Sequence, residues 1–410
     1  MATVNLKEVM EAVQKKIYAA DSSTSNLQDL IYLLKAAKRG DGTMVQQVAS
    51  ASVLPDLTDS AADTEMIAFV QNEGKLYFKQ DSSGTTVWKT YTVTPSAPSF
   101  VYGGETSGFF SGSLLYPGGG GTSSSSIIKI PFTSDTGSSS QGSTTVAMNN
   151  AHGWSNSTNG YIAGGSSSPV TAFDLTQIEK FPMSSAASSS DTGADLSTFR
   201  GGGAANHNES YGYATAGNPV ASPTVANATD KYTFANETSN AAIISGLTNV
   251  SPQMRYSSGV PSPTYAYIAG GQNPAVSAYL NNIEKFPFAA EDTVSDVGDL
   301  FLAHHSGAAV ASTENGYIMG GNISPTYTNT IQKWSFSSDG NGTDVADLTA
   351  ASYGSGGCSS TTAGYKAGGI ITSPTFTTLT NTEKFTFSSE SNSSNIGTSP
   401  IGSDAATQQV

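Results

Sequence analysis

Two arginines and two histidines recur at similar places in the second part of the chain, where such side chains could bind a polar or charged ligand. Arg200, Arg255, His304 and His305 each stand sixteen or seventeen residues ahead of the second glycine of a Gly-Gly pair or its equivalent, and Tyr353 does the same. Arginine, histidine and tyrosine side chains bind ligands through charge and hydrogen bonds. Their shared offset indicates that one recurring element holds all five of them.

Aromatic residues lie in the polar, proline-containing loops that follow the Gly-Gly pairs. Aromatic rings can stack on sugar rings, and polar groups around them can bind hydroxyls. If both sets meet on one face, the sequence predicts a glycan-binding surface. Its candidate residues are Arg200, Arg255, His304, His305, Tyr353, Phe173, Tyr279, Tyr327 and Phe376. The alternative is that the arginines and histidines only hydrogen-bond neighbouring loops.

Acidic residues follow a repeated lysine at a fixed offset of six. These acids could form ion pairs with the lysines, bind a cation, or accept hydrogen bonds in turns. The lysines are Lys129, Lys180, Lys231, Lys285, Lys333 and Lys384, and the acids are Asp135, Glu237, Glu291, Asp339 and Glu390. The sequence leaves these three alternatives open.

No pattern in the sequence combines a nucleophile with a base, so we predict no catalytic residue, metal ligand or cofactor. The segment Ser189-x-Asp191-x-Gly193 is similar to the Asp-box turn of sialidases, but a sialidase needs three clustered arginines and this part of the chain has two. A copper radical oxidase needs a cysteine–tyrosine crosslink and histidine ligands, and no histidine lies near Cys358 in the sequence. The glycine runs at 118–121 and 201–203 are not followed by the lysine of a P-loop.

The repeated lysines are separated by 51, 51, 54, 48 and 51 residues, which reveals a sixfold internal repeat. Each unit contains a strand that ends in Gly-Gly, as in GYIAGG at 160–165, and then a strand with lysine before an aromatic residue, as in IEKFPM at 178–183. A period near fifty is the length of one four-stranded propeller blade.

These units resemble the kelch repeat family over about three quarters of the chain. The resemblance rests on the Gly-Gly strand and on the aromatic strand about fifteen residues later. It implies a mainly β protein, in which a six-bladed kelch-like β-propeller over residues 96–410 follows a short helical segment and a small β module. Residues 388–410 look like the start of another unit, and we expect them to supply a strand that closes the ring.

The first hundred residues divide into two predicted parts. Apolar residues at helical spacing predict a helical anchor over 1–43, which docks on another chain, self-associates or packs within its own domain. Its core candidates are Leu6, Val9, Met10, Val13, Ile17, Leu30 and Leu34. Residues 44–95 are predicted to be a linker over 44–62 and then a meander with strands at 66–70, 75–80 and 86–93.

Composition narrows the function classes. The net charge of −14 lies mostly in the repeats, which argues against nucleic-acid binding. The single cysteine excludes a disulfide within one chain, and no apolar window is long enough for a membrane span. The start of the chain lacks the apolar region of a signal peptide, so we expect synthesis in a cytoplasm without secretion.

The order of helical segment, β module and Ser/Gly-rich propeller resembles virion proteins of tailed phages, particularly those of marine cyanobacteria. The segment VLPDLTDSAADTEMIAFVQNEGKLYFKQ at 53–80, with Trp88 after it, is similar to an adaptor module in such proteins. The resemblance implies a virion protein that forms a homo-oligomer in the particle. Its N-terminal part would bind other virion proteins, and its propeller would contact a host-surface polysaccharide. The alternatives are a propeller glycan hydrolase or lyase and a cellular scaffold that binds proteins.

Overall fold

The computed structural model of the 410-residue chain divides into two compact units, Met1–Ser99 and Phe100–Val410. It describes residues 106–115, 121–135, 137–167, 174–218, 228–247, 254–372 and 376–409, together with four strands in the first unit. Among these residues, no helix is long and apolar enough to cross a membrane.

The first unit contains a four-stranded sheet in the order β1-β2-β3-β4. Its strands are β1 (Val45–Val48), β2 (Ile67–Val70), β3 (Lys75–Ser82) and β4 (Thr85–Tyr91). Strands β2, β3 and β4 form the predicted antiparallel meander, whereas β1 pairs with β2 in parallel. The prediction of a linker throughout 44–62 is therefore wrong at β1. The predicted helical anchor, with all its candidate residues, lies outside the described residues.

The second unit is a six-bladed β-propeller, and each blade is a four-stranded antiparallel sheet. From the inner to the outer strand, the first three blades are β30 (Ala406–Gln409), β5 (Ser107–Leu115), β6 (Thr122–Pro131) and β7 (Ser139–Met148); β8 (His152–Ser155), β9 (Asn159–Ala163), β10 (Gln177–Pro182) and β11 (Ser190–Asp195); and β12 (Ala204–His207), β13 (Tyr211–Thr215), β14 (Thr229–Thr233) and β15 (Ala242–Ile243).

The last three blades have the same order. They are β16 (Ser258–Pro261), β17 (Tyr265–Asn273), β18 (Ala278–Pro287) and β19 (Ser295–Asp299); β20 (Ala308–Ala311), β21 (Asn315–Asn322), β22 (Tyr327–Ser335) and β23 (Thr343–Asp347); and β24 (Gly356–Ser359), β25 (Ala363–Ala367), β28 (Asn381–Thr386) and β29 (Ser394–Thr398). A two-stranded hairpin of β26 (Ile370–Thr372) and β27 (Phe376–Thr378) extends blade 6, and a short 3-10 helix covers Ser245–Leu247.

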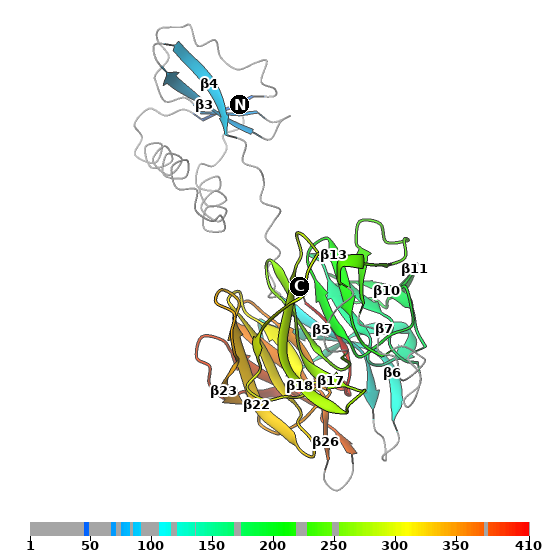
Figure 1. The fold of residues 1–410 in the computed structure, drawn as a ribbon. Helices are drawn as coiled ribbons and strands as arrows, with labels where there is room; N and C mark the ends of the chain where they lie inside the picture. The colour runs from blue at the N-terminus through cyan, green and yellow to red at the C-terminus, as the bar shows by residue number, and fades with distance from the viewer. Residues whose placement is uncertain are drawn as a thin grey trace. The chain divides into compact units, whose positions relative to one another are not determined.

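The C-terminal strand closes the ring, as expected from the sequence. Strand β30 pairs antiparallel with β5, so the two ends of the repeat region share blade 1, where the red end of the chain meets the cyan strands (Figure 1). The six inner strands surround a central channel of about 160 Å³, lined mainly by glycine, alanine, serine and threonine. Glycine alternates with larger residues around its middle: Thr407, Gly153, Ala205, Gly259, Ala309 and Gly357.

The Gly-Gly pair that ends the second strand of four blades has a conformational reason. In blades 2, 4, 5 and 6 both glycines have positive φ, for example 71° and 125° at Gly320 and Gly321. This backbone is costly for residues with a Cβ. The bend lets the N–H of the second glycine donate to the segment before the next blade, as Gly321 does to the Ser352 carbonyl at 2.9 Å. The pair therefore connects neighbouring blades.

A closed ring of six backbone hydrogen bonds joins the inter-blade linkers, the segments that connect each outer strand to the next inner strand. One residue in each linker has a left-handed backbone, and its N–H donates to the carbonyl of the equivalent residue in the preceding blade. Five of these bonds are 2.6–2.9 Å long, and the sixth joins Tyr256 N–H to the Gly202 carbonyl. The ring consists of Asn150, Gly202, Tyr256, Ser306, Gly354 and Asp404.

Five inter-blade ion pairs connect the lysine of one blade to the acid of the next, so the structure selects ion pairing among the three predicted alternatives. They are Lys180–Glu237, Lys231–Glu291, Lys285–Asp339, Lys333–Glu390 and Lys384–Asp135. A tyrosine hydroxyl of the lysine's blade also donates to each acid, as Tyr213 does to Glu291 at 2.6 Å. Burial raises the pKa of these tyrosines, so they stay protonated donors.

The interface between blades 1 and 2 lacks this arrangement. Phe109 stands in place of the tyrosine, and Ala186 stands where the other blades have the acid. The Gln141 side chain of β7 instead donates to the Pro182 carbonyl at 3.0 Å, and it also contacts the Ser185 carbonyl. Neutral hydrogen bonds thus hold this interface, at which the acid and the tyrosine are replaced while Lys129 remains.

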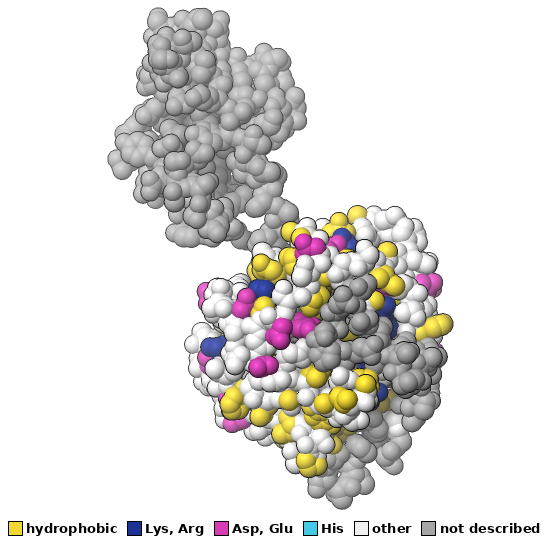
Figure 2. Space-filling model, viewed as in Figure 1, with side chains coloured by type: hydrophobic (Ala, Val, Ile, Leu, Met, Phe, Trp, Pro, Cys, Tyr) yellow, Lys and Arg dark blue, Asp and Glu magenta, His cyan; other side chains and the backbone are white. Residues whose placement is uncertain are grey.

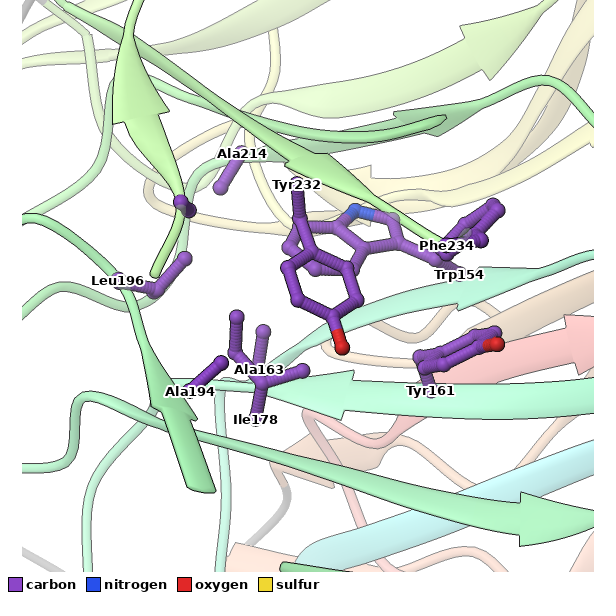
Figure 3. Packing of buried hydrophobic residues seen from close by; sticks show 10 residues of the cluster. Trp154, Tyr161, Ala163, Ile178, Ala194, Leu196, Ala214, Tyr232 and Phe234 are labelled. Carbon is purple, nitrogen blue, oxygen red and sulfur yellow. The ribbon is translucent and has the colours of Figure 1, made fainter. Parts of the chain in front are cut away.

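Aromatic side chains fill the space between blades. At the interface of blades 2 and 3, Tyr161 stacks on Phe234 with ring centroids 4.4 Å apart, and Trp154 stacks on Tyr232 at 5.9 Å (Figure 3). The Trp154 indole also donates to the Tyr213 carbonyl at 3.0 Å. The aromatic residue after five of the six repeated lysines is therefore a core residue, and Ile130 takes this place in blade 1.

The described surface of the propeller is mostly uncharged. In Figure 2 white atoms, which belong to the backbone and to uncharged side chains such as serine and threonine, predominate, and several dark-blue cationic side chains lie beside magenta acidic ones. This arrangement agrees with the ion pairs, which use most of the positive charge of the repeats. The large hydrophobic side chains exposed in the described residues are few: Phe199, Ile243, Val276 and Phe301.

The first glycine of the pair is replaced by Ala216 in blade 3, where φ is 59°. We expect Ala216→Gly to raise the free energy of unfolding by up to about 1 kcal/mol, or ~2 °C in Tm, because the left-handed backbone strains alanine. Thermal and denaturant unfolding would measure the change. Ala214→Gly, on the same strand, should instead lower the stability, and destabilisation by Ala216→Gly would contradict this explanation.

The best-buried inter-blade ion pair gives a second test. Glu291 accepts bonds from both Lys231 and Tyr213, so Glu291→Gln should lower the free energy of unfolding by roughly 1–2 kcal/mol. Lys231→Met should cost a similar amount, and the double variant should cost less than the sum. The neighbouring exposed acid provides the control, because Asp292→Asn should have almost no effect. Additive losses would show that the pair is not coupled.

Candidate ligand-binding surface

Three predicted site residues occupy equivalent places in three neighbouring blades. Arg255, His305 and Tyr353 each form an isolated backbone bridge with the hairpin between the second and third strands of their own blade. The linkers and these hairpins thus lie at the same end of the propeller, which we call the linker side. The equivalent residues of blades 1 to 3 are small or uncharged: Ser403, Asn149 and Gly201. The regular fold therefore does not require large side chains here.

The side chains on blades 4 to 6 form one connected group, which we call the aromatic surface. The Arg255 guanidinium lies 5.3 Å from the Tyr256 ring centroid, and the Tyr256 and His305 centroids are 5.5 Å apart. His305 contacts Tyr279 at 4.8 Å and Tyr353 at 6.5 Å. Tyr353 in turn stacks on Tyr327 at 4.6 Å. The aromatic surface consists of Arg255, Tyr256, Tyr279, His305, Tyr327 and Tyr353.

An open depression borders the aromatic surface between blades 4 and 5. Its volume is about 470 Å³, and its lining is Gln272, Ser277, Tyr279, Ala303, Ile323 and Ser324. The lining thus combines one aromatic ring with amide, hydroxyl and aliphatic groups. Five members of the aromatic surface remain partly exposed, and only His305 is almost fully covered, with 9% of its surface accessible. A flat or chain-like ligand could contact these rings and the depression together.

Tyr256 is a member that the sequence reasoning missed, and its backbone is unusual. It belongs to the hydrogen-bonded ring, at a left-handed φ of 55°. The other blades have Gly, Asn, Asp or Ser at this position, residues that suit such a turn better than an aromatic residue does. Comparing the repeats at this position could have identified Tyr256 from the sequence. A strained aromatic residue beside exposed rings is typical of a binding site.

Arg200 and His304 were predicted to contact a ligand on this face, but both side chains are fully buried. The Arg200 guanidinium lies 3.4 Å from the Asp230 carboxylate and donates to the carbonyls of Ala214 and Ala228. Burial lowers the pKa of Arg200, and the charge of Asp230 opposes this shift. Arg200 thus connects two strands of blade 3. For this residue the alternative prediction is confirmed: the side chain hydrogen-bonds neighbouring segments and does not lie on the surface.

His304 lies one residue before the exposed bridge position and points into the protein. Its Nδ1 is 3.1 Å from the Leu302 carbonyl, and its ring packs against Gly270, Gly307 and Gly321. Side chains at those glycines would collide with the imidazole, so the glycines make room for it. His304 is therefore a core residue.

The two remaining predicted aromatics cannot be placed on this surface. Phe173 lies outside the described residues, and only the backbone of Phe376 is described, within β27. Gln272 was not predicted, yet its side-chain oxygen accepts a hydrogen bond from Arg255 Nε at 2.9 Å. Its position after a Gly-Gly pair is the signal that links it to the bridge residue.

The described residues bring together no catalytic arrangement. Within the described ranges, no three histidine, cysteine, aspartate or glutamate side chains are placed to hold a metal ion. Burial raises the pKa of the Cys358 thiol, which keeps it unreactive. Burial also lowers the pKa of Lys366 to about 8, but its side chain is fully covered and lies 3.7 Å from Glu383.

No protein-family model matches the sequence, and no curated protein matches it. The function therefore has to be inferred from the fold and from this surface.

The four histidines predict how stability depends on pH. Burial lowers the pKa of His152 and His207 to about 3, and that of His304 and His305 to about 4. The unfolded chain therefore binds more protons than the folded protein below about pH 6.5. We expect the free energy of unfolding to fall steeply as the pH is lowered from 6.5 to 4, because each histidine contributes a slope of up to about 1.4 kcal/mol per pH unit in this range.

Asp404 opposes this loss of stability, because burial raises its pKa to about 6 and the folded protein therefore binds its proton more tightly. Since it is a single group, it offsets only part of the effect of the four histidines. Denaturant unfolding at several pH values would measure the dependence. His207→Asn should make the dependence on pH shallower, because it removes one of the four buried histidines. Asparagine can still hydrogen-bond Ser155 on the neighbouring inner strand, as His207 does. Equal stability at pH 7 and pH 4.5 would contradict the role of the histidines.

Proposed function

We propose that this protein is a structural component of a virus particle that presents its propeller to a polysaccharide on the host cell. In this proposal the aromatic surface binds the sugar chain, and the N-terminal part binds other virion proteins. We further propose that the chain is related to kelch repeat proteins and to virion proteins of tailed phages, as its sequence motifs suggest. In the particle it would form a homo-oligomer.

The observation that carries the proposal is the asymmetry of the linker side. The interior repeats regularly from blade to blade, whereas large aromatic and cationic side chains occupy the bridge positions of blades 4 to 6 alone. Core packing does not account for them, because Arg255, Tyr279, Tyr327 and Tyr353 are partly exposed. Tyrosine contributes an apolar ring and a hydroxyl together, which suits a sugar with its apolar faces and polar edges.

The charge and polarity of the propeller also support display outside a cell. Serine, threonine and glycine dominate its described surface, and most cations are in ion pairs. Such a surface resists nonspecific association with nucleic acid. A rigid closed ring is also suited to recognition, because little conformational entropy is lost when a ligand binds to a preformed surface.

Substitution of the stacked tyrosine pair tests the proposed surface. We expect Tyr327→Ala and Tyr353→Ala each to weaken binding of the purified full chain to host-cell polysaccharide by about tenfold, because a stacking platform is lost. Binding would be measured by glycan array and by biolayer interferometry. Tyr265→Ala is the matched control, since Tyr265 is also partly exposed but lies at the opposite end of the propeller, under the Lys285 ammonium.

Unchanged binding in both test variants would refute this assignment of the surface. The release of reducing sugar during the assay would instead favour an enzyme. The structural part of the proposal predicts that the chain copurifies with intact particles at a constant ratio. Its absence from purified particles would refute that part while leaving the binding assignment open.

A further inference from the structure

Arg255 differs from most other cations of the propeller because it forms no ion pair with a carboxylate of the described residues. The repeats contain nine lysine and arginine residues, and seven of them form ion pairs within the described residues. The other two are Lys129, which lies over the Phe109 ring, and Arg255. In a protein with excess acid, a guanidinium on the linker side that no described carboxylate pairs with is therefore an exception.

The contacts of Arg255 leave part of its guanidinium available. Its Nε donates to Gln272 Oε1 at 2.9 Å, which fixes the plane of the group, and the Tyr256 ring lies beside it. Its two terminal nitrogens donate to no group in the described part of the chain. Together they can present parallel N–H donors to two oxygens of one anionic group.

The available donors lie next to the depression on the aromatic surface. Gln272, which orients Arg255, also lines the depression, and Tyr279 forms another part of its lining. An anionic group bound by Arg255 would therefore belong to a molecule that can reach Tyr279. The distances from Tyr279 through His305 to Tyr353 and Tyr327 continue this surface across three blades.

We propose that the ligand of the aromatic surface is an acidic polysaccharide, whose carboxylate or sulfate groups bind Arg255 while its sugar rings lie on Tyr279, Tyr327 and Tyr353. This inference rests on the proposed glycan-binding function and adds the chemical class of the ligand. The net negative charge of the propeller does not prevent such binding, because salt screens distant charges beyond about 8 Å under physiological conditions.

Matched pairs of polymers test this inference. The probes are polygalacturonate with its carboxyl-reduced form, and dextran sulfate with dextran, measured by interferometry on the full chain in 0.15 M salt. The protein should bind at least one acidic polymer about 10- to 100-fold more tightly than its neutral partner, as expected for one charged hydrogen-bonded contact. The two pairs distinguish a carboxylate from a sulfate.

Variants of Arg255 locate the effect. Arg255→Gln should abolish the preference for the acidic polymer, whereas Arg255→Lys should keep part of it, because lysine retains the charge but loses the paired donors. Lys129→Gln removes the other cation outside the ion pairs and should leave the preference unchanged. Thermal unfolding of each variant would verify that the propeller remains folded.

The outcomes separate this inference from the proposed function. If acidic and neutral polymers bind equally and Arg255→Gln changes neither, the inference is wrong while polysaccharide binding stands. If Lys129→Gln removes the preference as fully as Arg255→Gln does, general charge rather than the Arg255 site is responsible, and the inference is again wrong. If no polysaccharide from any source binds, the proposed function fails and the inference fails with it.

Discussion

The closed ring of six backbone hydrogen bonds is the constraint on which the rest of the propeller depends. Each linker residue must take a left-handed backbone so that its N–H reaches the preceding blade, and the sixth bond returns to the first. Such a ring closes only if the rotations between successive blades add up to a full turn. Three features help to meet this requirement at different distances from the axis. They are the recurring Gly-Gly bend, the small residues along the channel and the tyrosine–acid–lysine contacts.

Stability and recognition occupy different positions of the same repeat. The ion pairs, the stacked aromatics and the glycine bends recur in nearly every blade, and these features hold neighbouring blades together. The side chains at the bridge positions of the linkers are not needed to hold the blades together, so arginine, histidine and tyrosine can occupy these positions in blades 4 to 6. Local departures from an otherwise consistent pattern are typical of functional sites. Tyr256 combines both roles, because its backbone closes the ring while its side chain joins the aromatic surface.

Much of the architecture could be predicted from the sequence, whereas the assignment of individual side chains could not. The spacing of the lysines revealed six blades, and the extra C-terminal segment indicated how the ring closes. Arg200 and Arg255 lie 17 and 16 residues before the second glycine of their blade's pair. This difference of one residue decides whether the side chain points into the core or toward the surface. In an extended linker, neighbouring residues point in opposite directions, so a spacing that is known only to within one residue cannot show whether a side chain is buried or exposed. Strand β1 was missed because its short, polar sequence lacks a clear alternation.

The pairing of β30 with β5 has a consequence for how the protein acquires its structure. The Ser111 hydroxyl of β5 hydrogen-bonds the Gln408 side chain of β30, across 297 positions of the chain. A contact of such long range forms late, because the entropy of closing a large loop has to be overcome first. During synthesis on the ribosome, five blades can therefore assemble while the first still lacks its inner strand and exposes the edge of β5. An exposed strand edge readily pairs with another chain, so the last step of folding is also the step at which newly made copies would be most open to domain swapping.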